Sequence, residues 1–411
     1  MRLAMISEHA SPLAALGGED SGGQNVYVAD LARRLGTMGH EVDVFTRQDN
    51  PLLPEVVPFA EEVRVINLPA GPAMRIPKDD LFPYMAPFRD AFYRFAREEP
   101  TAYDLVHANF WMSGWVACEA KRDLGLPFAQ TFHALGATKR REQGGADTSP
   151  PERPAAEFRI VEEADRILAT CPAEVEELTE LYDTDPARLS LVPCGVDIGT
   201  FRPVDKKEAR RALGLPDRPT VVYVGRLVPR KGVATLIEAF ALLPRGLDAR
   251  LVIVGGEPGG SPEIAQLSAL AEGLKVREGV IFAGSRPQGE LYRYYGAADA
   301  AVSVPHYEPF GMTPLEAMAC ATPVVGSEVG GIKTSVADGA SGFLVPPKRA
   351  EVLADRLLRL LSDGELRDRM GRAARRRVEE RYTWERVARL AAAAFSKVVR
   401  ETAAPRATGT A

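Results

Sequence analysis

The sequence predicts two α/β domains, each built on a doubly wound and mostly parallel sheet. Short apolar runs alternate with helical patterns along most of the 411 residues, and such alternation is typical of a parallel sheet covered on both faces. A stretch rich in proline, glycine and charge interrupts the alternation over 195–219, after which the pattern restarts. The chain is also too long for one ordinary hydrophobic core. We therefore place the domains at 1–198 and 199–382.

The first domain begins with a strand over 2–7, followed by an amphipathic helix over 23–39 that ends at a glycine. Helices are expected in most of the gaps between strands, for example over 112–124 and 173–182. The polar, Gly/Pro-rich insert over 142–154 fits a mobile active-site loop and a plain surface loop equally well. The remaining strands are expected over 41–46, 63–68, 104–107, 128–132, 167–170 and 189–193.

The second domain repeats this order. Strands are expected over 220–224, 250–254, 280–283, 300–303 and 323–325. Helices are expected over 233–243, 263–272, 288–297, 314–320, 351–361 and 365–377. The last helix, over 383–400, has apolar residues at helical spacing and so one buried face. Residues 402–411 are small and polar and are expected to form a disordered tail.

Composition limits the class of function. The net charge of −5 argues against non-specific binding of nucleic acid, which requires a basic surface. No stretch approaches the ~20 apolar residues of a membrane span, and the amino-terminus does not read as a signal peptide. The four cysteines and five histidines show no metal-ligand spacing. We expect a cytoplasmic protein with reduced thiols, no metal and no membrane contact.

Two acids, Glu308 and Glu316, frame the most informative segment. We expect a loop up to Gly311 and a helix that begins near Pro314, which places Glu316 in the first turn. Backbone N–H groups at a helix start suit a diphosphate, and neighbouring carboxylates can accept hydrogen bonds from sugar hydroxyls. The segment therefore fits a sugar nucleotide. A loop acid beside an ordinary first-turn glutamate explains the spacing about as well.

Two cations, Arg226 and Lys231, share the loop after the strand over 220–224. A guanidinium and an ammonium on one loop would neutralise a diphosphate and stabilise a leaving nucleotide as its bond breaks. The alternative is a pair of solvated surface cations.

A glycine-rich turn follows the first strand, where Gly22 and Gly23 open the first helix. Glycines let the backbone approach a phosphate closely. The turn lacks G-x-G-x-x-G, so a nicotinamide dinucleotide is not supported. The alternative is a flexible turn in which Asp20 or Ser21 caps the helix.

Three further candidates follow strands. His133 ends the strand over 128–132 and could approach a donor sugar or an acceptor, although a lone histidine is more often structural. Gly255 and Arg286 follow two strands of the second domain and could frame a nucleotide base. Tight turns explain the glycines equally well.

Taken together, the runs over 20–28, 225–232 and 308–317 resemble family four of the retaining glycosyltransferases, which have the GT-B fold. The amino-terminal half looks closest to the branch of sucrose-phosphate synthases and mycothiol glycosyltransferases. The resemblance implies two Rossmann-like domains that face each other across a cleft, with the final helix packing back on the first. It also implies transfer of a hexose from a nucleoside diphosphate sugar, UDP-glucose or UDP-N-acetylglucosamine, to a small hydroxylated acceptor with or without a phosphate.

The resemblance also implies roles for individual residues. In the donor site, Arg226 and Lys231 bind the diphosphate, Glu308 the transferred sugar and Glu316 the ribose. His133 lies at the reaction centre. Backbone groups complete this site, and they belong to Gly22, Gly23, Phe310, Gly311 and Met312. No metal or cofactor is required. Retention is explained by attack of the acceptor hydroxyl on the face from which the nucleotide leaves.

The acceptor is less constrained. In the mycothiol branch, an inositol phosphate is held by residues that match Asn25, Lys78 and Arg153 here. Phe110 and Ala134 depart from that set, because they lack the hydroxyls of a tyrosine and a threonine. Each missing hydrogen bond costs about 1–2 kcal/mol if it is buried. This argues against the same acceptor and leaves another phosphorylated sugar open.

Three alternatives are weighed against a UDP-sugar transferase. A dehydrogenase fails on the missing dinucleotide motif. A regulatory protein that binds nucleotide sugars without turnover should have lost at least one site residue, and all are intact. A GDP-mannose-dependent mannosyltransferase stays open. The expected partners are small molecules, with no nucleic acid and no membrane, and a homodimer is open.

Overall fold

A computed structural model describes residues 1–14, 22–256 and 261–403. The chain divides into two compact units. Unit 1 combines Met1–Pro193 with the segment from Trp384 onward, and unit 2 is Cys194–Thr383. The sequence places the first boundary a few residues further along, at 198/199. Each unit is described by itself.

Unit 1 is built on an eight-stranded sheet in the order β3-β4-β2-β1-β5-β6-β7-β8. Every neighbouring pair is parallel except β3 with β4. The strands are β1 (Arg2–Ile6), β2 (Glu41–Arg47), β3 (Val56–Ala60), β4 (Val63–Leu68), β5 (Leu105–Asn109), β6 (Phe128–Thr131), β7 (Arg166–Ala169) and β8 (Leu189–Leu191). The sequence analysis did not find β3, which is an edge strand with exposed and half-buried residues and a proline at its centre.

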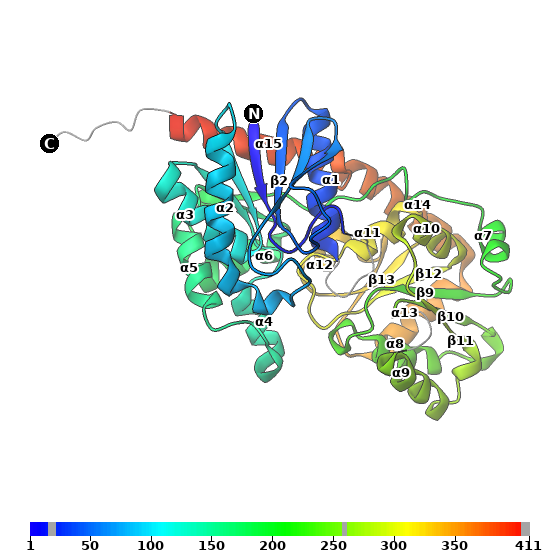
Figure 1. The fold of residues 1–411 in the computed structure, drawn as a ribbon. Coiled ribbons are helices and arrows are strands. Elements are labelled where there is room, and N and C mark those ends of the chain that lie inside the picture. The colour runs from blue at the N-terminus through cyan, green and yellow to red at the C-terminus, as the bar shows by residue number, and fades with distance from the viewer. Residues whose placement is uncertain (15–21, 257–260, 404–411) are drawn as a thin grey trace. The chain divides into compact units, whose positions relative to one another are not determined.

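Seven α-helices cover this sheet in the described part of unit 1. They are α1 (Gly23–Thr37), α2 (Met85–Glu98), α3 (Trp111–Leu124), α4 (Gly136–Gln143), α5 (Arg153–Glu163), α6 (Pro172–Tyr182) and α15 (Trp384–Ala403). Helix α15 packs on α1 (Figure 1), where the rings of Trp384 and Tyr27 lie 5.8 Å apart. The expected return of the last helix to the first domain is confirmed. The helix continues through residues 402 and 403, which we had assigned to the tail, and 404–411 lie outside the described residues.

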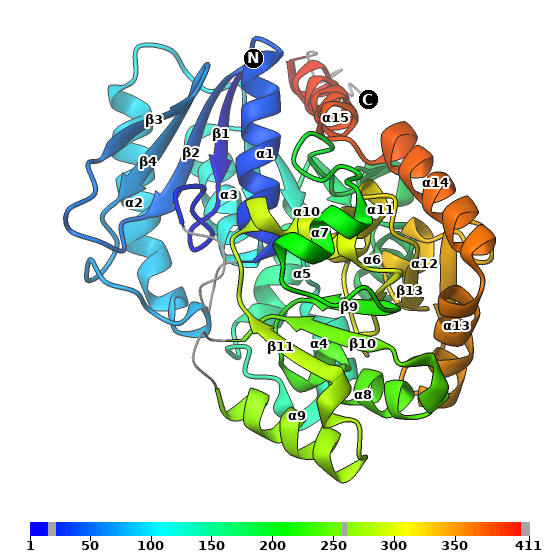
Figure 2. The same cartoon turned by 90° about the vertical axis from the view of Figure 1, so that its right-hand side faces the viewer.

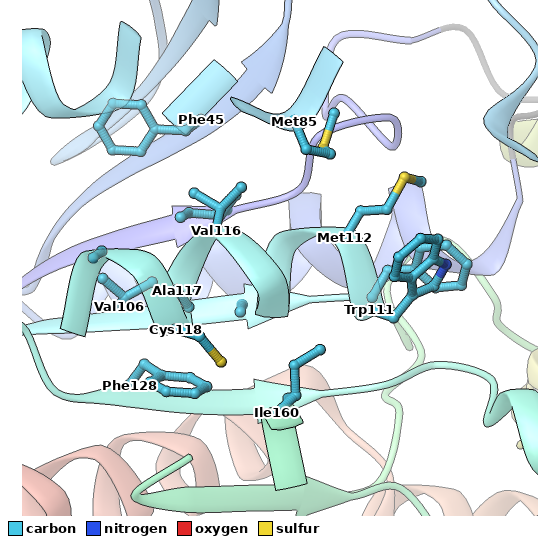
Figure 3. Close-up of a cluster of buried hydrophobic side chains, with 14 of the residues drawn as sticks. Phe45, Met85, Val106, Trp111, Met112, Val116, Ala117, Cys118, Phe128 and Ile160 are labelled. Atoms are coloured by element: carbon cyan, nitrogen blue, oxygen red, sulfur yellow. The ribbon is translucent and has the colours of Figure 1, made fainter. Parts of the chain in front are cut away.

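The core of unit 1 is centred on α3 (Figure 3). Met112, Val116 and Cys118 of this helix are buried, together with Phe128 of β6 and Ile160 of α5. Each fully buried side chain of this size contributes about 1.5–3 kcal/mol. This packing fixes the positions of the loops that follow β5 and β6.

The insert over 142–154 is held by side-chain contacts. Residues up to Gln143 belong to α4, and a short 3-10 helix follows over Gly144–Ala146. Lys139 pairs with Asp147 at 2.9 Å, and the Thr148 hydroxyl donates to Asp79 at 2.6 Å. The insert is therefore attached to the segment that carries Lys78.

Unit 2 is built on a six-stranded parallel sheet in the order β11-β10-β9-β12-β13-β14 (Figure 2). The strands are β9 (Thr220–Val224), β10 (Arg250–Val254), β11 (Val280–Gly284), β12 (Ala300–Ser303), β13 (Val324–Ser327) and β14 (Gly342–Val345). Strand β14 was missed because it is four residues long and begins with a glycine. A Cβ at Gly342 would overlap the Val324 carbonyl, so the glycine permits this pairing.

The helices of unit 2 lie on both faces of its sheet. They are α7 (Lys206–Ala212), α8 (Val233–Ala241), α9 (Pro262–Gly273), α10 (Gln288–Ala297), α11 (Met312–Ala319), α12 (Ile332–Ser335), α13 (Ala350–Ser362) and α14 (Gly364–Arg381). Helix α11 begins at Met312, two residues before the expected start. Glu316 therefore lies in the second turn, and the prediction that it belongs to the first turn is wrong.

Both sheets reverse their strand order once near the middle, between β1 and β5 in unit 1 and between β9 and β12 in unit 2. In doubly wound sheets, ligands bind at the carboxyl ends of the strands beside such a reversal. The loops after β1, β5, β9 and β12 are therefore the first places to look for a site. No helix in the described ranges is long and apolar enough to cross a bilayer.

Candidate active site

An ion pair marks the strand reversal of unit 2. Lys231 ends a short 3-10 helix after β9, and its ammonium binds the Glu308 carboxylate in the loop after β12. The His306 N–H donates to the Arg230 carbonyl at 2.8 Å and ties the two loops together. Burial raises the pKa of Glu308, but the attraction of Lys231 and Arg230 outweighs it and holds that pKa below its ordinary value. Glu308 is thus an anion that is only 15% exposed.

Two arginines stand beside this pair. The Arg226 side chain is exposed, and its charge also lowers the pKa of Glu308. Its carbonyl accepts a hydrogen bond from the buried Tyr223 hydroxyl at 2.8 Å, which holds the loop. Arg230 Nη1 lies 4.0 Å from Glu308 Oε2. The structure thus brings Arg226 and Lys231 together with Glu308, as expected, and adds Arg230, which the sequence analysis missed.

The segment that joins Glu308 to α11 depends on glycines. Gly311 precedes α11 with φ +89°, a backbone conformation that residues other than glycine rarely adopt. Gly330, with φ +43°, lies so close that a Cβ would overlap the Glu308 carbonyl. The Phe310 ring is buried, and its centroid lies 6.4 Å from that of the Tyr382 ring. Only the main chain of Phe310 is therefore available to contact a ligand. Together with Met312, these residues form the start of α11, where N–H groups lack intrahelical partners.

Glu316 is held from inside the helix. It is buried, and Oε2 accepts a hydrogen bond from the Tyr295 hydroxyl at 2.9 Å. Burial raises the pKa of Glu316 to about 7. Tyr295 was not predicted as a site residue, because a tyrosine in α10 is expected to be core.

Gly255 and Arg286 follow neighbouring strands. The Gly255 N–H donates to the Gly284 carbonyl at 3.0 Å, and a Cβ at Gly255 would overlap the Gly225 carbonyl. A glycine is thus required at position 255 because the ends of three strands approach one another closely there. Arg286 is exposed, and its Nε donates to the Tyr294 hydroxyl at 2.9 Å.

In unit 1, His133 follows β6 with φ +59°, which is uncommon outside glycine. Its Nε2 lies 3.0 Å from Asn109 Oδ1, at the end of the neighbouring strand β5. Because the amide oxygen is an acceptor, this contact places the proton on Nε2 and leaves Nδ1 as an acceptor. Burial lowers the pKa of His133 to about 3. The imidazole is therefore neutral at physiological pH.

Phe110 follows β5 with φ +82° and ψ 165°, a region that is almost restricted to glycine. Its ring meets the His9 ring edge-on at 5.0 Å, and the Arg153 guanidinium lies 5.1 Å from its centroid. Strain of this kind is worth about 1–3 kcal/mol and clusters at functional sites. Phe110 is therefore a candidate site residue because of its strained backbone as well as its side chain.

An open pocket lies beyond the carboxyl ends of β1 and β2 in unit 1. Two predicted acceptor residues, Asn25 and Lys78, line it. The lining also includes Glu8, His9, Ser11, Ala14, Thr46, Arg47, Asp49, Arg75, Ile76 and Leu81. Phe110 and Arg153 are not among the lining residues, although Phe110 contacts His9.

The sequence analysis missed five charged or titratable residues of this pocket, Glu8, His9, Arg47, Asp49 and Arg75. Their signal was their position, because Glu8 and His9 follow β1 and Arg47 ends β2. Arg47 is buried and donates to the carbonyls of Pro72 and Met74 at 2.8 and 2.5 Å. It fixes the segment that brings Arg75 to the pocket.

Arg153 is already engaged in the protein. It is 2% exposed, and its Nε pairs with Glu157 at 2.8 Å. Its Nη2 donates to the Ala134 carbonyl at 2.6 Å. These contacts hold the loop after β6, which carries His133. Binding of the acceptor by Arg153 stays a prediction.

Gly22 and Gly23 open α1 and are exposed. The Gly22 N–H donates to Asn25 Oδ1 at 3.0 Å, while Asn25 Nδ2 donates to the Ser11 carbonyl at 3.0 Å. Asn25 thereby joins the glycine turn to the loop after β1. Asp20 and Ser21, the expected helix caps, lie outside the described residues.

Comparison with known families matches both halves of the chain. The profile described as Glycosyltransferase Family 4 covers residues 21–200, and that of Glycosyl transferases group 1 covers residues 205–377. A D-inositol 3-phosphate glycosyltransferase from Actinosynnema mirum is 39% identical over 405 residues, which span 96% of this chain and 97% of that protein. The chain is a family 4 glycosyltransferase. The predicted family and activity class are confirmed.

Other relatives agree. The D-inositol 3-phosphate glycosyltransferase of Acidothermus cellulolyticus is 42% identical over 372 residues, with 88% of this chain and 83% of that protein covered. Among solved structures, a sucrose-phosphate synthase from Thermosynechococcus elongatus has 35% identity and a TM-score of 0.89, with 97% and 99% coverage. The Anabaena protein HepE, in complex with UDP and glucose, has 21% identity and a TM-score of 0.77 over 97% and 100% of the two chains. The predicted GT-B fold of this glycosyltransferase is confirmed.

No group of three His, Cys, Asp or Glu side chains in the described ranges is arranged to hold a metal ion. The positive charge near Glu308 comes from Arg226, Arg230 and Lys231. The start of α11 adds a partial positive charge. The surroundings of Glu308 thus carry both guanidinium and ammonium groups.

Proposed function

We propose that this glycosyltransferase moves a hexosyl group from a UDP-sugar, UDP-glucose or UDP-N-acetylglucosamine, to a phosphorylated cyclitol or sugar, with retention at the anomeric carbon. The observation that carries the proposal is the pairing of Lys231 with the half-buried Glu308, beside two arginines and the start of α11. One anion among three cations suits a ligand that has both a diphosphate and hydroxyl groups.

The donor would use these groups in two ways. Its diphosphate forms ion pairs with Arg226 and Lys231, and its sugar hydroxyls donate hydrogen bonds to Glu308. Glu316 would accept hydrogen bonds from the ribose hydroxyls, and Arg286 would lie beside the base. As the glycosidic bond breaks, negative charge grows on the departing phosphate, and fixed cations stabilise that charge in the transition state.

Retention follows from front-face attack in this proposal. The acceptor hydroxyl attacks on the face from which the nucleotide leaves, and the departing phosphate takes its proton. Glu308 is engaged with Lys231 and is not assigned as a nucleophile. The neutral His133 would offer its Nδ1 lone pair to a hydroxyl of the reacting sugar. Neither a metal nor a cofactor is assigned a role.

The acceptor is assigned to the pocket of unit 1. Arg75 and Lys78 give this pocket two cations that suit a phosphate group, whereas the Arg47 guanidinium donates to main-chain carbonyls. The named relatives, D-inositol 3-phosphate glycosyltransferases and a sucrose-phosphate synthase, also act with phosphorylated compounds according to their names. Because Phe110 and Ala134 lack hydroxyls, we favour a phosphorylated sugar over inositol 3-phosphate.

The test is a two-dimensional screen that follows nucleotide release. UDP-, GDP- and ADP-sugars are each combined with inositol 3-phosphate, with hexose phosphates such as fructose 6-phosphate, and with the unphosphorylated counterparts. Turnover with a UDP-sugar and a phosphorylated acceptor supports the proposal. Turnover only with GDP-mannose favours the mannosyltransferase, and tight binding of a nucleotide sugar without turnover favours the regulatory protein.

A further inference from the structure

We propose that Glu8 is a positioning residue for the acceptor. It holds the His9 imidazole with its proton on Nδ1, so that Nε2 presents a lone pair to the pocket of unit 1. This inference rests on the proposed function in one respect, since it places the acceptor in that pocket. The part that concerns the proton on His9 stands independently.

The Glu8 carboxylate is fixed from two sides. It lies two residues after the end of β1 and is 1% exposed. Oε1 lies 2.7 Å from His9 Nδ1, and Oε2 accepts a hydrogen bond from the Ser113 hydroxyl of α3. The Glu8 carbonyl also accepts the Arg47 N–H at 3.0 Å, so the main chain is held as well. Both the position and the orientation of the carboxylate are therefore determined before any ligand arrives.

Hydrogen-bond chemistry then determines which nitrogen of His9 carries a proton. An ionised carboxylate can only accept hydrogen bonds, so the nitrogen that faces Glu8 is the donor. In a neutral imidazole the other nitrogen, Nε2, is left as an acceptor. The edge-on contact with the Phe110 ring at 5.0 Å restricts rotation of the imidazole. The same logic operates where a carboxylate orients a histidine in metal sites and catalytic triads.

The pocket thereby acquires two kinds of group. Arg75 and Lys78 are donors and suit a phosphate. His9, once its proton is on Nδ1, offers an acceptor that suits a ring hydroxyl. An acceptor with both a phosphate and a hydroxyl would be oriented at two points. Glu8 acts through His9 and does not need to touch the ligand itself.

The direct test is nuclear magnetic resonance of protein labelled with ¹⁵N in its histidines. The chain has five histidines, at 9, 40, 107, 133 and 306, and a His9→Gln variant assigns the signal of His9. We expect the wild-type protein to show the proton of His9 on Nδ1. Glu8→Leu should bring the two nitrogen shifts of His9 towards the average of exchanging tautomers. A wild-type proton on Nε2 overturns the inference, whatever the enzyme turns over.

Asp49→Asn is the matched control. Asp49 lines the same pocket and has no hydrogen bond to His9 among the described contacts. Asp49→Asn removes one negative charge from the pocket, as Glu8→Leu does, but it leaves the Glu8 carboxylate in contact with His9 Nδ1. We expect the His9 signals to stay as in the wild type. Equal changes in Asp49→Asn and Glu8→Leu would show that the charge of the pocket, and not the contact with Glu8, controls His9.

Steady-state kinetics test the consequence for the acceptor, with fructose 6-phosphate or inositol 3-phosphate as the probe that the screen identifies. Glu8→Leu should raise the KM for that acceptor about tenfold, as expected for one lost hydrogen bond. The KM for the UDP-sugar and kcat should stay within about twofold. Glu8→Gln should show a smaller rise, because its amide oxygen still accepts from Nδ1. An unchanged acceptor KM in Glu8→Leu, with a folded protein, overturns the inference. If no phosphorylated acceptor is used at all, the proposed function fails and the labelled-histidine experiment still judges Glu8.

Discussion

The Lys231 ammonium and the Glu308 carboxylate form an ion pair at the point where the strand order of unit 2 reverses. Each comes from a different loop, one after β9 and one after β12. An ionised pair that is 21% and 15% exposed keeps both charges available in a site of reduced polarity. A nucleotide sugar would replace this internal pairing with its own diphosphate and hydroxyls.

Lys231→Ala and Glu308→Ala should each nearly abolish transfer. Loss of a single group that stabilises developing charge costs about 10²–10³ in kcat. Lys207→Ala is the control, because Lys207 is an exposed lysine of α7 in the same unit. Circular dichroism should show an intact fold in all three variants. Near-normal turnover in either site variant would remove Lys231 and Glu308 from the site.

Gly330→Ala should impair both stability and activity. Gly330 has φ +43°, and a Cβ would overlap the Glu308 carbonyl, so the Glu308 loop must move. We expect a loss of about 2–4 kcal/mol in the free energy of unfolding and a large fall in kcat/KM.

Gly339→Ala is the matched control for this variant. It also has a positive φ of +71°, but nothing lies within 4 Å of the added Cβ. It should lose about 1–2 kcal/mol from backbone strain and keep its activity. If denaturant titration and kinetics give the same result for both variants, the close packing of Gly330 on Glu308 has no functional weight.

Glu316→Gln should change how stability depends on pH. Burial raises the pKa of Glu316 to about 7 in the folded protein, above the unfolded value of about 4.3. Between these values the folded state binds more protons, so the free energy of unfolding of the wild type falls as pH rises through this window. The variant lacks this loss, which amounts to about 4 kcal/mol at most.

The measurement is a series of denaturant titrations from pH 4 to 8. The stability of Glu316→Gln relative to the wild type should increase with pH up to about 7 and then level off. Glu316→Gln should also bind the UDP-sugar more weakly than the wild-type protein does. A difference in stability that does not vary with pH would contradict the assignment of a raised pKa to Glu316.

EDTA should leave the activity unchanged. The charge of the diphosphate is assigned to Arg226, Arg230 and Lys231 together with the start of α11. Transfer is measured before and after exhaustive dialysis against EDTA, with and without added Mg²⁺ or Mn²⁺. Loss of activity on dialysis that either ion restores would overturn this assignment.

The fold of both units could be predicted because their strands are short, apolar and separated by helical patterns. The exceptions have physical reasons. Strand β3 carries Pro58 and lies at an edge, so it lacks the buried alternation that identifies a strand. Strand β14 begins at Gly342, which looks like a turn but is required by the close approach to Val324. Helix α11 begins at Met312 because Gly311 adopts a positive φ just before it.

The donor side of the site was easier to predict than the acceptor side. Glu308, Arg226 and Lys231 belong to compact motifs that follow strands, and the structure brings them together. Arg230 looked like one more surface cation. Glu8 was missed because a glutamate after a strand looks like an ordinary loop acid. Only the fold brings Ser113 to its carboxylate and shows the contact between that carboxylate and the ring of the adjacent His9.

Arg153 shows the opposite limit. Glu157 lies one helical turn after Arg153, a spacing that favours an ion pair on a helix, but the sequence analysis did not consider Glu157 as its partner. A basic residue beside a proposed pocket therefore looks available when its guanidinium is already bound inside the protein. The resemblance to the mycothiol branch implies that Arg153 binds the acceptor, and a measurement of acceptor binding would test this role.

The most direct test of the central claim is the stereochemistry of transfer from a UDP-sugar. Proton NMR of the product of an α-linked donor and a phosphorylated acceptor should show an α-linked anomeric proton, with one UDP released for each bond formed. Lys231→Ala should remove both signals together. A β-linked product would contradict retention, and transfer that is unaffected by Lys231→Ala would contradict the assigned site.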